Sequence, residues 1–251
     1  MPKLHFPLPV LVWQMLLMGL LGLSGIIFVP VLLRTADARL MATVLVAQVY
    51  VYYLVLLVQF GFSWSGPAAL ARAAHATGVA QVWRSSVKAK LRLLAGPVAL
   101  LFGLGYASLA WGQWYLQWFV VLLTASALNS NWFLQARHNF AAGVSYAALG
   151  VGVSTLMLCM GVSWHALNGA WVVLILVMPQ VCLGVGSWWR ACQACASAAI
   201  GAEPAAEQNG LSVLRKDAPL VTSQLLLLAS TTLGTVVVGW LANAHTTAAY
   251  A

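Results

Sequence analysis

Seven long stretches of this 251-residue chain contain no charged side chain, and this feature most limits how it folds. An α-helix needs about 20 apolar residues to cross the hydrocarbon core of a bilayer, and every stretch is close to that length or longer. None shows the alternation of apolar and polar residues that a membrane β-strand requires. The pattern predicts an all-α, polytopic transmembrane bundle of about seven spans. They cover residues 8–33, 40–63, 93–111, 115–136, 141–162, 167–189 and 219–242.

The charge content excludes whole classes of protein. Only 6% of the residues are charged, whereas a soluble domain carries about 25%. The 12 Lys and Arg residues are also too few and too scattered for a nucleic-acid-binding face. We therefore expect a membrane protein surrounded by lipid, with no nucleic-acid partner.

The basic residues also predict how the chain is oriented. If the N-terminus is cytoplasmic, ten of the 12 basic residues lie on the cytoplasmic side and only Arg34 and Arg39 lie opposite. Basic loops remain in the cytoplasm, so this asymmetry favours a cytoplasmic N-terminus. The loop 64–92 carries Trp83 among its bases and is expected to form an amphipathic helix on the membrane surface.

A polar linker suggests how the chain is divided. Residues 201–218 contain its Pro-, Glu- and Gly-rich stretch, and they follow the sixth predicted span. A shift of 210 residues also lays Pro9–Gln14 over Pro219–Gln224, each a proline that opens an apolar run. We expect a first lobe of six helices at 1–200, a cytoplasmic linker, and at 219–251 the first helix of a second, incomplete lobe. The chain would then be the N-terminal portion of a longer protein.

The chain lacks most of the chemistry that membrane enzymes use. Its acidic residues, Asp37, Glu203, Glu207 and Asp217, all lie outside the predicted spans, which excludes an acidic proton relay within these helices. No glycine-rich phosphate loop or paired-histidine metal motif occurs. The pair Cys192 and Cys195 has a spacing seen in zinc sites but no suitably spaced further ligands. We expect no catalytic residue, no metal and no cofactor, and hence not an enzyme.

Uncharged polar residues within the spans are the candidate site. Asn131, Gln135 and His138 have the spacing i, i+4, i+7, which predicts one polar stripe along the helix 115–136. The stripe ends beside Arg137, so it suits a path for an anionic headgroup such as a sugar pyrophosphate. The predicted substrate path comprises Gln48, Gln59, Arg72, Asn131, Gln135 and Arg137.

Small residues predict where helices approach one another closely. Gly19, Gly22 and Gly25 lie on the first span, and Ala148 and Gly152 lie on the fifth. Small side chains at such spacings let two membrane helices pack backbone to backbone.

Three segments resemble the lipid-linked oligosaccharide flippases of the Wzx type, in the MATE-like exporter superfamily. Gln59-Phe-Gly-Phe-Ser-Trp-Ser65, with Gly66-Pro67-Ala68 and Ala71-Arg72 after it, is similar to the end of the second helix in that family. Asn131-Trp-Phe-Leu-Gln135 resembles its fourth helix, and residues 236–251 resemble its seventh helix and the loop beyond. The chain departs from the family pattern at Gln59, where an acid is common, and at Ser63, where Asn is common.

The resemblance implies a protein of polysaccharide biosynthesis, in the O-antigen and lipopolysaccharide class. Such a flippase moves an undecaprenyl-pyrophosphate-linked oligosaccharide across the bacterial inner membrane by alternating access between two lobes. Its expected partners are this lipid-linked oligosaccharide, membrane lipids and the polysaccharide polymerase machinery. Three alternatives stay open: a small-metabolite membrane transporter, an integral-membrane enzyme of envelope polysaccharide synthesis, and a structural or truncated assembly partner.

Overall fold

The computed structural model describes residues 8–59, 61–73, 76–109, 114–164 and 167–196, with Thr222, Ser223 and Leu226. Within these ranges the chain is all-α and contains no strand, as predicted. The helices are α1 Leu8–Thr35, α2 Ala38–Gln59, α3 Phe62–Arg72, α4 Ala76–Leu109, the 3-10 helix η1 Trp114–Trp118, α5 Phe119–Leu128, α6 Asn131–Ala136, α7 Phe140–Ser163 and α8 Gly169–Ala196.

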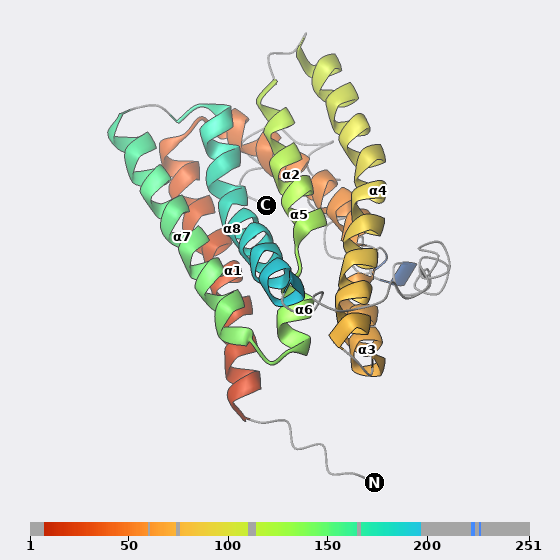
Figure 1. The fold of residues 1–251 in the computed structure, drawn as a ribbon. Helices are drawn as coiled ribbons and strands as arrows, with labels where there is room; N and C mark the ends of the chain where they lie inside the picture. Colours follow the sequence, from red (N-terminus) through yellow and green to blue (C-terminus); the bar gives the residue numbers. More distant parts are fainter. Residues whose placement is uncertain are drawn as a thin grey trace.

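The long helices run alternately up and down (Figure 1). The short helices α3 and α6 lie at one end of the bundle, together with the last turns of α8, and we call this the α6 end. The turn between α1 and α2, with Arg34 and Arg39, lies at the opposite end. This alternation is the one that the positive-inside prediction requires.

Four helices are long and apolar enough to cross a membrane. They span Val12–Thr35, Ala38–Gln59, Phe140–Ser163 and Gly169–Ala196. Large apolar side chains on α1 stay exposed, among them Met15 at 66% and Ile26 at 71%. Exposed side chains of this kind suit a lipid environment and not water. The chain is therefore a multi-pass membrane protein.

The predicted third span is part of a longer helix. The segment 93–111 corresponds to the second half of α4, which begins at Ala76 and runs for 34 residues. The first half of α4 is helical as expected but does not lie on the membrane surface. Trp83 is only 6% exposed, because it packs against α6 within the bundle. The apolar face expected to meet lipid instead joins the protein core.

The predicted fourth span, 115–136, is not one helix. It is divided into η1, α5 and α6, with the main break at Asn129 and Ser130. Asn and Ser side chains compete with helical hydrogen bonds by binding the nearby backbone. Here the Oδ1 atom of Asn129 accepts a hydrogen bond from the backbone N–H of Asn131 at 2.9 Å, which closes a turn and ends α5.

Close helix contacts occur at glycines other than the predicted ones. A Cβ atom on Gly19, Gly22, Gly25 or Gly152 would meet nothing within 4 Å. A Cβ on Gly150 of α7, in contrast, would lie 2.6 Å from the Cα atom of Pro179 on α8. The close approach of α7 and α8 therefore depends on Gly150, and the prediction for Gly152 was wrong.

The structure does not describe most of the predicted linker and second lobe. The linker 201–218 and the helix 219–242 lie outside the described residues, apart from Thr222, Ser223 and Leu226. The division into two lobes remains a prediction from sequence.

Candidate functional site

The break between α5 and α6 is held by hydrogen bonds from two other helices. The backbone N–H of Ser130 donates to the hydroxyl of Ser187 on α8 at 3.0 Å. The indole Nε1–H of Trp83 on α4 donates to the hydroxyl of Ser130 at 2.9 Å. Both serines are buried, with exposed fractions of 1% or less. The backbone N–H of Ser130, which has no helical partner at the break, thereby has an acceptor inside the protein.

Lys90 on α4 reaches the same break. Its Nζ atom donates to the backbone carbonyl of Asn129 at 2.7 Å and lies 5.8 Å from the centre of the Phe62 ring on α3. The side chain is 1% exposed. Lys90 precedes the predicted span 93–111, and burial lowers the pKa of its ammonium from 10.5 to about 7. Asp37 is the one carboxylate in the described ranges, and it belongs to the α1–α2 turn at the opposite end.

The break turns α6 so that it packs among its neighbours at the α6 end. Trp132, Phe133 and Leu134 of α6 are all buried, in a cluster that includes Ala191 and Cys195 of α8. Trp132 lies so close to Gly66 of α3 that a Cβ there would come 2.5 Å from its ring. A helix of six residues is fixed in this way by packing on both sides.

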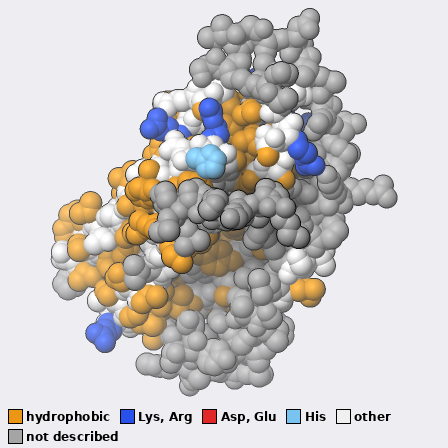
Figure 2. All heavy atoms as spheres, turned by 90° about the horizontal axis from the view of Figure 1, so that it is seen from below, with side chains coloured by type: hydrophobic (Ala, Val, Ile, Leu, Met, Phe, Trp, Pro, Cys, Tyr) orange, Lys and Arg blue, Asp and Glu red, His pale blue; other side chains and the backbone are white. Residues whose placement is uncertain are grey.

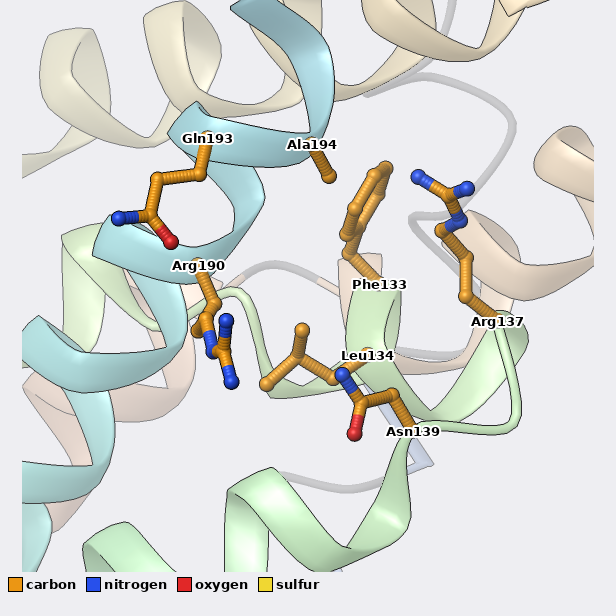
Figure 3. Close-up of a pocket in the computed structure, with 7 residues that line it drawn as sticks. All are labelled: Phe133, Leu134, Arg137, Asn139, Arg190, Gln193 and Ala194. Carbon is orange, nitrogen blue, oxygen red and sulfur yellow. The ribbon is translucent and has the colours of Figure 1, made fainter. Parts of the chain in front are cut away.

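A cavity of about 430 Å³ lies between α6 and α8 (Figure 3). One wall comes from α6 and the turn after it, and the other from the last turns of α8. Arg137 and Arg190, one from each wall, supply two positive charges, and Asn139 and Gln193 supply two side-chain amides. The lining residues are Phe133, Leu134, Arg137, Asn139, Arg190, Gln193 and Ala194.

Arg137 is held at the mouth of this cavity by local structure. It is the C-cap residue of α6, and its guanidinium lies 5.8 Å from the centre of the Phe133 ring. A cation over an aromatic face is attracted by the ring quadrupole. Both Arg137 and Arg190 are exposed to solvent, so each side chain retains donors for a ligand.

The predicted polar stripe does not extend along one helix. Asn131 and Gln135 share α6, but the helix ends at Ala136 and His138 has a left-handed backbone with φ 57°. The i+7 position is therefore lost, and including His138 in the stripe was wrong. The carboxamide of Asn131 contacts Gly143 of α7, where a Cβ would lie 2.5 Å from its Oδ1 atom.

Of the six predicted path residues, Arg137 is the one that lines the cavity. Gln48 on α2 donates to the hydroxyl of Tyr52 at 3.0 Å, and Gln59 at the end of α2 accepts from Ser63 at 3.4 Å. Arg72 ends α3, where its Nε atom donates to the carbonyl of Ala68 at 3.1 Å. These three residues therefore have partners on their own or the adjacent helix, and whether they line a substrate path stays a prediction.

Sequence reasoning missed Arg190, Gln193 and Asn139. Arg190 and Gln193 are three residues apart on α8, a spacing that puts both on one face and was visible in the sequence. Their approach to Arg137 was not visible, because it depends on how α6 is turned. Seen from the α6 end, the described side chains include basic groups around a histidine, and no acidic side chain is seen among them (Figure 2).

The cysteines at this end are thiols. Cys192 is half-buried and Cys195 is buried, and both are free. No group of three metal-ligating side chains occurs in the described ranges. The chain matches no family model, and no curated protein or solved structure is detectably similar to it.

Proposed function

We propose that this chain is the transport lobe of a flippase for an undecaprenyl-pyrophosphate-linked oligosaccharide, and that the cavity between α6 and α8 receives the pyrophosphate. The observation that carries the proposal is the pair Arg137 and Arg190 on the two walls of one cavity. Two guanidinium groups can each bind a phosphate through paired N–H donors.

Three features of the cavity support an anionic ligand. None of its described lining residues is acidic, so no carboxylate among them competes for the two arginines. Its volume of about 430 Å³ lies within the range typical of small-molecule sites. Asn139 and Gln193 add amide donors and acceptors that can hydrogen-bond a sugar.

The position of the cavity supports transport. It lies at the α6 end, which the distribution of basic residues assigns to the cytoplasm, where lipid-linked precursors are made. In this proposal the chain lies in the bacterial inner membrane. The chain binds and moves its substrate without changing it covalently, so it is not an enzyme.

A flipping assay in vesicles tests the proposal. The full chain is reconstituted with a fluorescent undecaprenyl-pyrophosphate-linked oligosaccharide, and movement to the other leaflet is followed by quenching. We expect Arg137→Ala and Arg190→Ala each to slow movement at least tenfold, whereas Arg34→Ala at the opposite end is the matched control and has no effect. Equal rates in all four proteins would overturn the proposal. If the vesicles take up a free sugar phosphate but the lipid-linked oligosaccharide does not move, the result would favour a small-metabolite transporter.

A further inference from the structure

A buried ammonium at the α5–α6 break is costly unless its surroundings compensate for it. Desolvation disfavours the charged form of a lysine, and no carboxylate in the described ranges is near enough to pair with Lys90. The compensation comes from the carbonyl of Asn129, which follows the last residue of α5, and from the ring of Phe62. A cation is favoured at a helix C-terminus because the carbonyl ends of the peptide dipoles converge there.

The same break determines where α6 lies. From α4, Lys90 hydrogen-bonds to Asn129 and Trp83 hydrogen-bonds to Ser130. From α8, Ser187 hydrogen-bonds to Ser130, so α4 and α8 both contact the end of α5 at these two residues. The cavity wall with Arg137 begins directly after it. Any shift at the break therefore moves Arg137 relative to Arg190, which sits on α8 one turn beyond Ser187.

We propose that Lys90 is a positioning residue: its ammonium ties α4 to the end of α5 and thereby fixes α6, and with it Arg137, against α8. Lys90 does not line the cavity and acts through Asn129. The part of this inference that concerns ligand affinity rests on the proposed anion site, whereas the part that concerns the position of α6 does not.

Cys195 provides a reporter for the position of α6. It lies on α8, is 2% exposed, and belongs to the buried cluster that contains Phe133 and Leu134 of α6. The full chain is prepared with alanine at the other three cysteines, and the rate at which N-ethylmaleimide modifies Cys195 is measured. We expect Lys90→Met to raise this rate about tenfold, because α6 separates from α8 more often. Arg92→Met removes one exposed charge from the same helix and is expected to leave the rate unchanged.

Ligand affinity as a function of pH provides a second readout. Inorganic sulfate is the probe, because it does not titrate near neutrality. Since Lys90 loses its proton near pH 7, wild-type affinity should fall between about pH 6 and about pH 8.5, whereas Lys90→Arg, which stays charged, should keep its affinity. A purely structural role for the side chain would not produce this difference.

Other groups must be excluded as the source of the pH effect. His138 lies in the turn beside Arg137, so His138→Gln is measured in parallel and should retain the wild-type fall in affinity. Helices α2, α3, α5, η1 and α8 pack against α4. The described titratable or charged side chains on these elements are Arg39, Tyr50, Tyr52, Tyr53, Arg72, Tyr115, Cys182, Arg190, Cys192 and Cys195.

The outcomes separate the two proposals. Unchanged Cys195 modification in folded Lys90→Met overturns the positioning role, and Lys90→Gln decides by the same criterion if the methionine variant does not fold. Faster modification without any binding of sulfate to the wild type supports the positioning role and contradicts the proposed anion site. Faster modification together with a pH-dependent affinity that Lys90→Arg abolishes supports both.

Discussion

The hydroxyl of Ser187 accepts a hydrogen bond from the backbone N–H of Ser130 at 3.0 Å and donates one to the carbonyl of Gly184, also at 3.0 Å. One side chain on α8 thus satisfies a backbone donor that the break between α5 and α6 leaves without a helical partner. A buried N–H with no acceptor is costly. The hydroxyl that α8 supplies therefore stabilises the break.

Ser187→Ala should destabilise the protein by about 1–3 kcal/mol, the usual cost of a buried donor left unpaired. Ser145→Ala is the matched control, because Ser145 is exposed and bonds only within its own helix, to the carbonyl of Ala142. Thermal unfolding of both variants in one detergent, followed by circular dichroism, measures the difference. If Ser187→Ala and Ser145→Ala unfold at the same temperature, the hydrogen bond to Ser130 adds no stability.

Gly150→Ala should destabilise the protein, whereas Gly152→Ala should not. A Cβ at position 150 would lie 2.6 Å from the Cα atom of Pro179 and 3.0 Å from the Met178 carbonyl, both backbone atoms that cannot rotate away. We expect a loss of about 1–3 kcal/mol from the overpacking. Position 152 has open space, so alanine should be neutral or stabilise α7 by up to about 1 kcal/mol. Equal melting temperatures for the two variants would contradict this account of how α7 and α8 pack.

The all-α fold was predictable because its signal is local. A run of about 20 apolar residues without charge suffices to predict a span. The segments 8–33, 40–63, 141–162 and 167–189 correspond to α1, α2, α7 and α8, although α2 ends earlier, at Gln59, and α8 continues to Ala196. The bounds of α4 were not predictable in the same way, because hydropathy identifies only the apolar half of this helix. The buried contacts of Trp83, which join the basic half to the bundle, involve residues 47 positions away.

The candidate site was predictable only in part, and for a related reason. Arg137 stands out because it follows a polar stretch in an apolar segment, whereas Arg190 resembles any basic residue at the cytoplasmic end of a span. The two come together because α6 turns away from α5 at Asn129 and Ser130. That turn depends on Trp83, Lys90 and Ser187, which lie on other helices, so local sequence around Arg137 does not reveal it.

Binding of an anion between Arg137 and Arg190 should be weakened by salt. Both guanidinium groups are exposed, so mobile ions screen their attraction for a ligand. We expect sulfate affinity, measured by isothermal titration calorimetry, to fall about tenfold when the salt concentration rises from about 0.05 M to about 0.5 M. In the double variant that carries Arg137→Gln and Arg190→Gln, the dependence of sulfate affinity on salt should largely disappear. The Arg34→Gln variant should behave as the wild type. A salt dependence that survives the double substitution would place the anion elsewhere.

Stability should rise with pH above neutrality because of Lys90. The pKa of its ammonium is about 7 in the folded protein and about 10.5 in an unfolded chain, so between these values the unfolded state binds more protons. Below about pH 7 both states are protonated, and the full cost of the buried charge is present. As the pH rises from about 7 to about 10.5, the folded state sheds the proton first and becomes more stable relative to the unfolded state.

Lys90→Met removes the titrating group and should abolish this rise. Thermal unfolding of the wild type and of Lys90→Met, measured at about pH 6.5 and about pH 9, gives two pH dependences whose difference isolates Lys90. Arg92→Met serves as the control for losing one positive charge from α4, and its pH dependence should equal that of the wild type. If Lys90→Met keeps the wild-type pH dependence, the ammonium does not titrate in this range, and the sulfate affinity of the wild type should then also be independent of Lys90 protonation.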